Sequence, residues 1–173
     1  MVPFLLPFSI GLMIALAIGL VLFLRFYQVP RPGTALIVRR AGKEPSLLLG
    51  RGAFVGGAER VDTIDLTERS LSLEVEAPFL DGARKVALDV SVRPSDAPAD
   101  VLALAAAYPA EVLGDVRRLE SALRPALSDA LAAFASKRSF GEARAAEGAV
   151  ALESELAAKL PLFRVERCAL SDV

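Results

Sequence analysis

Hydrophobic and polar positions follow three different patterns along the chain, and the first of them is an unbroken apolar run. Phe4 to Leu24 is a stretch of 21 residues without a charged side chain. As an α-helix with a rise of about 1.5 Å per residue it would measure roughly 31 Å, which matches the hydrocarbon core of a bilayer. The run therefore predicts a transmembrane helix within residues 1–26.

A cleaved signal peptide and a buried core helix are the competing interpretations of this run. A signal peptide needs a basic start and a small-residue cleavage site, and neither is present around Met1–Phe4 or Leu24–Tyr27. A core helix rarely stays uncharged on every face over such a length. We therefore favour a membrane anchor. The side chains expected to face lipid are those of Phe4, Leu5, Ile10, Leu12, Ile14, Leu16, Ile18, Leu20, Leu22 and Leu24.

Basic and aromatic residues flank only the C-terminal end of the run. Arg25, Phe26 and Tyr27 occupy the place of an interfacial belt. No Lys or Arg precedes the run, whereas Arg25, Arg31, Arg39, Arg40 and Lys43 follow it. By the positive-inside rule, we expect the C-terminal domain to be cytoplasmic. The expected location is a cell membrane, which we take to be bacterial, with a single pass of the chain.

The second pattern is strict alternation, which is typical of half-buried β-strands. Val29–Gly33 is rich in proline and ends the helix, and Thr34–Arg40 and Glu59–Leu66 then have strand character. Two longer strands follow on either side of the turn residues Asp81 and Gly82. Their inward positions are predicted to be Leu71, Leu73, Val75, Val86, Leu88, Val90 and Val92.

A glycine-rich segment, residues 46–57, interrupts the strands with two short apolar runs. One interpretation is a hairpin whose tip dips into the membrane surface through Leu47, Leu48, Leu49, Phe54 and Val55. The other interpretation, which we favour, is a buried strand pair with glycine bulges. A phosphate-binding loop is a poor match because the Lys-Ser/Thr ending and a clear following helix are missing.

The third pattern is a three- and four-residue spacing of apolar positions after Val92, which predicts helices. Ala99–Ala107 forms the first of them. The next carries a stripe of apolar residues and should kink or divide at Pro125, near Arg124. Ser139 and Glu142 have capping-box spacing and start the last helix, which is followed by a strand over 162–170. The stripe consists of Val112, Val116, Leu119, Leu123, Leu127, Leu131 and Phe134.

Together these patterns predict an α+β fold with two parts. Residues 1–26 form the anchor, and residues 27–173 form one domain with an antiparallel sheet, then helices, and a closing strand that rejoins the sheet or makes a small sheet of its own. The length of 173 residues suits one compact domain plus an additional segment.

Composition excludes several classes of function. The net charge is −1 with no basic stripe, so no nucleic-acid partner is expected. The chain has no His and a single Cys168, which we expect to be reduced, buried and structural, and this predicts neither a metal site nor a cofactor nor a Cys-His nucleophile. The carboxylate pairs Asp62/Asp65 and Glu74/Glu76 fit a solvated surface better than acid-base catalysis. We therefore expect no catalytic residues and no enzyme.

Four stretches resemble the domain shared by stomatins, prohibitins and flotillins, the SPFH or band 7 domain. They are the entrance Val29–Val38, the strand pair Arg60–Thr67 and Leu71–Val75, the turn and strand from Asp81 to Val92, and the terminal strand Phe163–Val173. The similarity covers residues 29–173, and the entrance and the glycine-rich segment are closest to the flotillin branch.

The resemblance implies a membrane-bound scaffold that is often oligomeric and that organises membrane patches at the cytoplasmic face. Family members usually continue into a long charged coiled coil, and no sustained heptad pattern occurs in this chain. The expected partners are the lipid bilayer, further copies of the chain or longer SPFH proteins. The alternative function is that of a regulatory subunit of one membrane protease or transporter.

Overall fold

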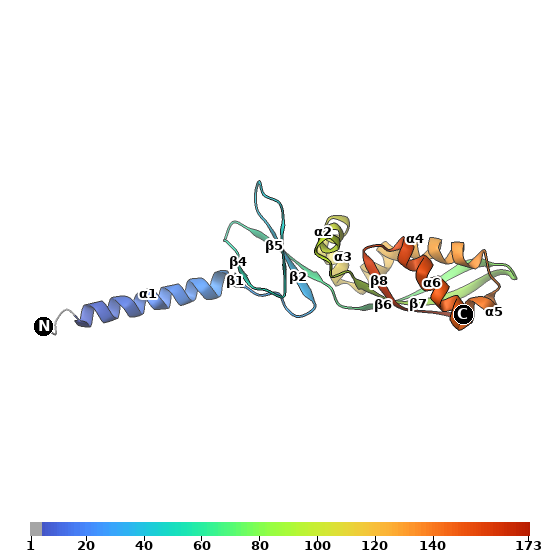
Figure 1. The fold of residues 1–173 in the computed structure, drawn as a ribbon, viewed down its shortest axis with the longest axis horizontal. Coiled ribbons are helices and arrows are strands. Elements are labelled where there is room, and N and C mark those ends of the chain that lie inside the picture. The colour runs from blue at the N-terminus through green and yellow to red at the C-terminus, as the bar shows by residue number, and fades with distance from the viewer. Residues whose placement is uncertain (1–4) are drawn as a thin grey trace. The chain divides into compact units, whose positions relative to one another are not determined.

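The computed structural model describes the backbone of residues 5–173 and the side chains from residue 9 onward (Figure 1). Phe4 lies outside the described residues, and so does the side chain of Leu5. The architecture is α+β with antiparallel sheets, as the sequence predicts. The chain divides into two compact units, residues 1–63 and residues 64–173.

The first unit consists of one long helix and short strands. Its helix ends at Phe26, before the proline-containing segment Val29–Gly33, and this agrees with the prediction. The strands belong to a two-stranded sheet, β1-β4, and a three-stranded sheet in the order β3-β2-β5. The elements are α1 (Leu5–Phe26), β1 (Tyr27–Gln28), β2 (Thr34–Arg39), β3 (Ser46–Leu49), β4 (Ala53–Phe54) and β5 (Arg60–Asp65), the last of which contains the boundary between the units.

The predicted strand pair within residues 46–57 is wrong. β3 pairs with β2, in a register that places Ala35 opposite Leu49, and β4 pairs with β1, in a register that places Tyr27 opposite Phe54. Gly50 separates the two strands with a φ of 64°, a backbone conformation that glycine adopts without strain. The local sequence contains two apolar runs, but the partner of each run comes from another part of the chain, which alternation alone cannot reveal.

The second unit is built on an antiparallel sheet in the order β6-β7-β8. The alternation predicted for β6 and β7 is confirmed, because Leu71, Leu73, Val86 and Leu88 are buried. The closing strand rejoins this sheet by pairing with β7 and does not form a separate one. The strands are β6 (Arg69–Phe79), β7 (Gly82–Pro94) and β8 (Phe163–Asp172).

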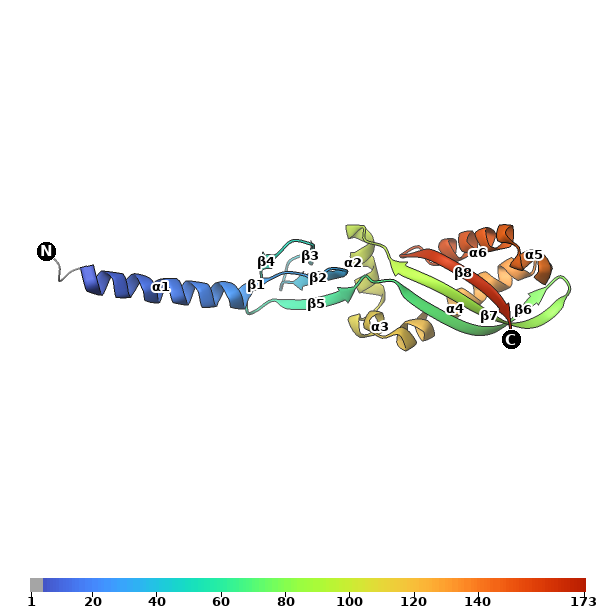
Figure 2. The ribbon, with the colours of Figure 1, turned by 90° about the horizontal axis from the view of Figure 1, so that it is seen from below.

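Helices cover the buried side of this sheet. α4 packs against β6, and α6 packs against β8 and α4 (Figure 1 and Figure 2). The apolar stripe from Leu119 to Phe134 is buried as predicted, whereas Val116 is exposed. The helices are α2 (Pro98–Ala107), α3 (Ala110–Gly114), α4 (Val116–Ala135), α5 (Phe140–Arg144) and α6 (Ala146–Lys159).

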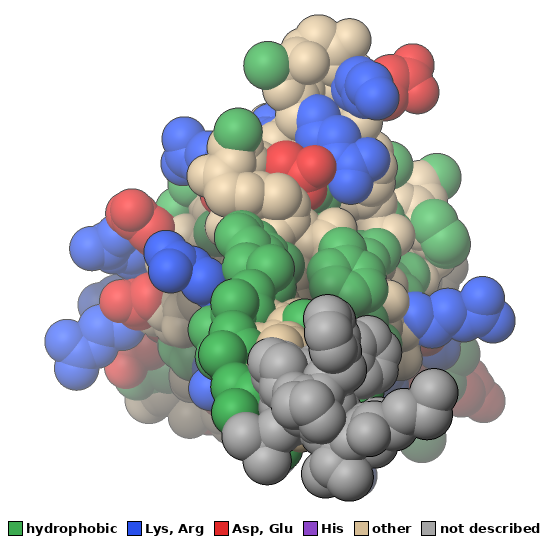
Figure 3. Space-filling view, turned by 90° about the vertical axis from the view of Figure 1, so that its left-hand side faces the viewer, with side chains coloured by type: hydrophobic (Ala, Val, Ile, Leu, Met, Phe, Trp, Pro, Cys, Tyr) green, Lys and Arg blue, Asp and Glu red, His purple; other side chains and the backbone are tan. Residues whose placement is uncertain are grey.

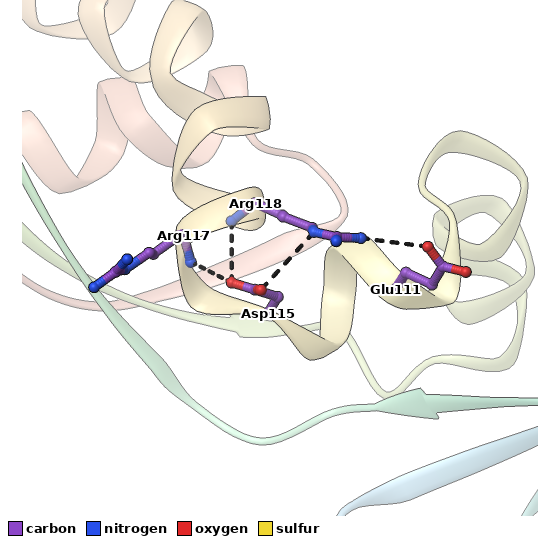
Figure 4. Close-up of polar contacts among 4 residues, drawn as sticks. All are labelled: Glu111, Asp115, Arg117 and Arg118. Carbon is purple, nitrogen blue, oxygen red and sulfur yellow. Dashed lines mark hydrogen bonds and ion pairs between the residues drawn. The ribbon is translucent and has the colours of Figure 1, made fainter.

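The helix divides at Asp115, so the predicted division at Pro125, near Arg124, is wrong. α4 runs through Pro125 without dividing. Asp115 has an extended backbone, and its carboxylate accepts hydrogen bonds from the backbone N–H groups of Arg117 and Arg118 (Figure 4). This N-cap satisfies donors that the first turn of a helix leaves unpaired, and the Arg118 guanidinium also contacts Glu111 at 3.3 Å.

The capping box of Ser139 and Glu142 is confirmed, with both reciprocal hydrogen bonds present. It starts the short helix α5, and a separate helix α6 begins after Ala145. The two helices approach closely at Gly148, where a Cβ would collide with the carbonyl groups of Glu142 and Ala143. The predicted single helix is therefore two helices, and Gly148 allows them to pack.

Candidate membrane interface

α1 is the one helix among the described residues that is long and apolar enough to cross a membrane. Its window Ser9–Phe26 has a mean hydropathy of 2.3, and none of it is buried. Every described side chain of the predicted lipid-facing set, from Ile10 to Leu24, is exposed. Hydrophobic side chains gather on the face of the molecule that Figure 3 shows. An apolar surface on every side of a helix needs an apolar solvent. Length and composition fit both a membrane anchor and a signal sequence.

Three aromatic rings meet at the C-terminal end of α1. Phe23 stacks on Tyr27 with ring centroids 4.8 Å apart, and Phe54 meets both rings edge-on at 5.4 Å. Phe23 and Phe54 remain exposed, while Tyr27 is half-buried. Aromatic rings at the end of an apolar helix are typical of the membrane-water interface. We call Phe23, Tyr27 and Phe54 the aromatic cluster.

Backbone contacts join this end of the helix to the short sheet that follows it. The N–H of Val55 donates to the carbonyl of Phe26 at 2.8 Å, directly beside the β1-β4 pairing. Gly52 lies against the ring of Tyr27. Residues 52–55 are therefore held at the helix end, although they lie more than twenty residues further along the chain.

The structure separates the five residues of the proposed membrane-dipping tip. Phe54 is 56% exposed and belongs to the aromatic cluster. Val55 is buried, and Leu47, Leu48 and Leu49 are half-buried on β3, where they pair with β2. Phe54 is consequently the residue of the five that is best placed to meet lipid.

Positive charge dominates the first unit. Residues 1–63 contain seven basic and three acidic side chains. Arg39 and Arg60 share Asp62, and Arg40 contacts Glu59 at 2.5 Å. The Arg40 contact holds the pKa of Glu59 below its usual value. Among the described residues of the first unit, four basic side chains make no ion pair with a carboxylate: Arg25, Arg31, Lys43 and Arg51.

A cavity of about 420 Å³ lies directly after α1 in the chain. We call it the Arg31 cavity. It is lined by residues from the segment after the helix and from the β2-β5 sheet, namely Gln28, Val29, Arg31, Thr34, Leu36 and Thr63. The Thr34 hydroxyl donates to the Arg31 carbonyl at 2.8 Å and fixes the turn that precedes β2. The cavity thus combines three polar side chains, an apolar wall and one cation, Arg31, which makes no ion pair with a described carboxylate.

A second concavity, also of about 420 Å³, lies in the other unit beside β8. We call it the β8 groove. Val150 of α6, which is 67% exposed, and Glu166, Arg167 and Cys168 of β8 belong to its lining. The register shifts between Ser91 and Val92, and the resulting bulge leaves Glu166 without a direct partner on β7.

Cys168, which we predicted to be buried and reduced, is free and only half-buried. Its thiol donates to the carbonyl of Ala149 at 3.3 Å, and burial raises the pKa of the thiol. A protonated thiol is a poor nucleophile.

The acidic residues that the sequence presents as catalytic candidates have structural surroundings. Glu74 and Glu76 are on the exposed face of β6, as predicted. Partial burial raises the pKa of Asp65, but hydrogen bonds from Thr67 and the contact with Arg69 outweigh this and lower it. Residues 5–173 contain no group of three or more His, Cys, Asp or Glu side chains that could hold a metal ion.

No protein-family model matches the chain, and no curated protein matches it.

Proposed function

We propose that this chain is a single-pass membrane scaffold of the SPFH type, closest to flotillins, which collects partners at the cytoplasmic face of the membrane. The observation that carries the proposal is the apolar surface of α1, exposed on every side and continuous with a folded domain. Burying such a surface in lipid yields about 25 cal/mol for each Å² that leaves water, which makes anchoring strongly favourable.

Retention of α1 is favoured by the way its end is built into the following sheet. Removal of a signal sequence after Tyr27 would take away the β1 half of the Tyr27–Phe54 pair and two of the three rings of the aromatic cluster. A helix that completes the domain next to it serves better as an anchor than as a cleaved leader.

The positive charge of the first unit supports the cytoplasmic orientation. Topology can be tested with the exposed Ser154 replaced by Cys in a Cys168→Ala background. A membrane-impermeant maleimide should label this residue only after the cells are permeabilised. Labelling in intact cells would reverse the assigned orientation.

Self-association has its support in the outer edge of β8. From Arg164 onward, the described residues contain no backbone hydrogen bond from β8 to any element other than β7. The stretch from Cys168 to Ser171 is also uncharged. A long edge strand of this kind is a template for pairing with another chain. The opposite edge, β6, contains Pro78, which lacks an N–H group and weakens pairing there.

A regulatory subunit of one membrane protease or transporter is the second candidate, and the β8 groove favours it. An extended segment of a partner could add to the edge of β8 and place an apolar side chain against Val150. The groove would then serve a single partner.

Crosslinking in native membranes followed by mass spectrometry distinguishes the two functions. The scaffold predicts multi-copy species of this chain or mixed species with related SPFH proteins. One stoichiometric partner of another kind would favour the regulatory subunit. A monomer in crosslinked membranes and in mild detergent would contradict the scaffold.

A further inference from the structure

We propose that the Arg31 cavity binds the phosphate of an anionic glycerophospholipid headgroup. This inference rests on the proposed anchoring of α1, because only an anchored helix brings the cavity to the bilayer surface. It goes beyond anchoring by assigning a specific lipid class to a specific set of residues.

The position of the cavity along the chain fits the headgroup layer. Gln28 and Val29 follow the last helical residue, Phe26, by two and three positions. Extended backbone advances about 3.3 Å per residue, so Gln28 lies at most about 7 Å beyond the helix end. The polar layer on each side of a bilayer is roughly 5–8 Å thick. The near wall of the cavity therefore lies at the depth of lipid phosphates.

The lining has the chemistry that a phosphodiester requires. The Arg31 guanidinium has no carboxylate partner in the part of the chain that the structure describes, and its planar group can donate two parallel hydrogen bonds to phosphate oxygens. The Gln28 amide and the Thr63 hydroxyl are further donors on the same cavity. Val29, which is 58% exposed, offers an apolar surface to the glycerol backbone. A volume of about 420 Å³ is within the ordinary range of small-molecule sites.

One electrostatic effect opposes an anion at this place. The C-terminal end of a helix carries a partial charge of about −0.5. Here the carbonyl of Phe26 accepts a hydrogen bond from Val55, and Arg25 lies in the last turn of α1. The full positive charges of Arg25 and Arg31 exceed the partial negative charge, so the local balance favours an anion.

General attraction between a basic protein unit and an anionic membrane is the alternative explanation for any lipid preference. The two explanations differ in which arginine matters. A cavity depends on Arg31, whereas general attraction depends equally on any exposed basic side chain of the unit. Arg51 is exposed, makes no ion pair among the described residues and does not line the cavity, so it is the matched control.

The test uses the full chain in nanodiscs made from an equimolar mixture of phosphatidylcholine and phosphatidylglycerol. Native mass spectrometry measures the lipids that stay bound after the disc is removed. The wild type should retain phosphatidylglycerol in excess, and Arg31→Gln should reduce this excess about tenfold, as expected for the loss of a charge-assisted contact. Arg51→Gln should retain the excess, and Thr63→Val should reduce it without changing the net charge.

Three outcomes would overturn the inference. They are no phosphatidylglycerol excess in the wild type, equal losses in Arg31→Gln and Arg51→Gln, or equal thermal stabilisation of the detergent-solubilised chain by inorganic phosphate and by short-chain phosphatidylglycerol. The last result would identify free phosphate as the ligand. A wild-type chain that does not enter nanodiscs would instead contradict the anchoring itself, so the two failures are distinguishable.

Discussion

Gly52 lies so close to the ring of Tyr27 that a Cβ atom on Gly52 would come within 2.5 Å of the Cζ atom and the hydroxyl oxygen of the tyrosine. No other side-chain type fits at this position unless the ring moves. The glycine therefore sets where Tyr27 sits, and with it the stacking on Phe23. A residue in the middle of a loop thus controls the aromatic cluster at the end of the helix.

Gly52→Ala should displace the ring of Tyr27 and destabilise the cluster by about 1 kcal/mol, the magnitude of an aromatic pair. The chain has no Trp and two Tyr residues, so in a Tyr108→Phe background the emission comes from Tyr27 alone. The quenching of the Tyr27 emission by brominated lipid in vesicles should therefore differ between Gly52→Ala and the chain that keeps Gly52. Gly57→Ala is the control, because its Cβ would lie 3.8 Å from Phe26, an ordinary contact. Identical quenching in both variants would refute the role assigned to Gly52.

A spin label at position 54 should report the membrane interface. Phe54 and Leu80 are both exposed apolar residues, but they belong to different units. In a Cys168→Ala background, a label on Phe54→Cys should be more accessible to oxygen than to a water-soluble nickel chelate. The same label on Leu80→Cys should show the reverse. Equal, water-like accessibilities at the two positions would contradict the interfacial location of Phe54.

Ala169→Lys should weaken self-association, because a Lys side chain on an edge strand disfavours pairing with another chain. Ser72→Lys is the matched control. Both residues lie directly opposite Asp89 on the exposed face of the sheet, Ala169 on β8 and Ser72 on β6. Crosslinked multimers in membranes should decrease several-fold for Ala169→Lys alone. If both variants lose multimers equally, or neither does, the β8 edge is not the contact.

Leu127→Ala should destabilise the second unit strongly. Leu127 is fully buried in the stripe of α4, and removal of a core leucine costs about 2–5 kcal/mol. Val116→Ala, in the same helix but at an exposed position, should cost less than about 1 kcal/mol. Thermal unfolding of the detergent-solubilised chain, followed by circular dichroism, compares the two. A small effect at Leu127 would contradict the packing of α4 against the sheet.

Ser139→Ala should destabilise α5 by about 1 kcal/mol, because the hydroxyl caps the N–H of Glu142.

The reciprocal bond from the Ser139 N–H lowers the pKa of Glu142 below 4.5. A lowered pKa adds stability that is fully present above pH 4.5 and is lost as the pH falls through the folded-state value. Glu142→Gln should therefore reduce the loss of unfolding free energy that the chain shows as the pH falls below 4.5. If Glu142→Gln leaves this pH dependence of the unfolding free energy unchanged, the capping box is not its cause.

The sequence alone determined the features that depend on local chemistry. The helix formed by the apolar run ends at Phe26, shortly before Val29–Gly33, which cannot continue a helix. The alternation in β6 and β7 and the capping box of Ser139 likewise follow from residues close in the chain. A uniform apolar run, a period of two and a capping pair each have one favourable local conformation, so they could be predicted.

Only the tertiary structure decided which distant segments meet. Tyr27 pairs with Phe54, and Thr63 joins Gln28–Leu36 in the lining of the Arg31 cavity, in each case across more than twenty positions. The division of residues 46–57 between two sheets likewise pairs β4 with the distant β1, and β3 with the nearer β2. The helical break at Asp115 in place of Pro125 belongs here too, because buried Leu123 and Leu127 hold α4 together on both sides of the proline. The free energy of packing is distributed over many non-local contacts. No local pattern in the sequence therefore specifies which segments will pair.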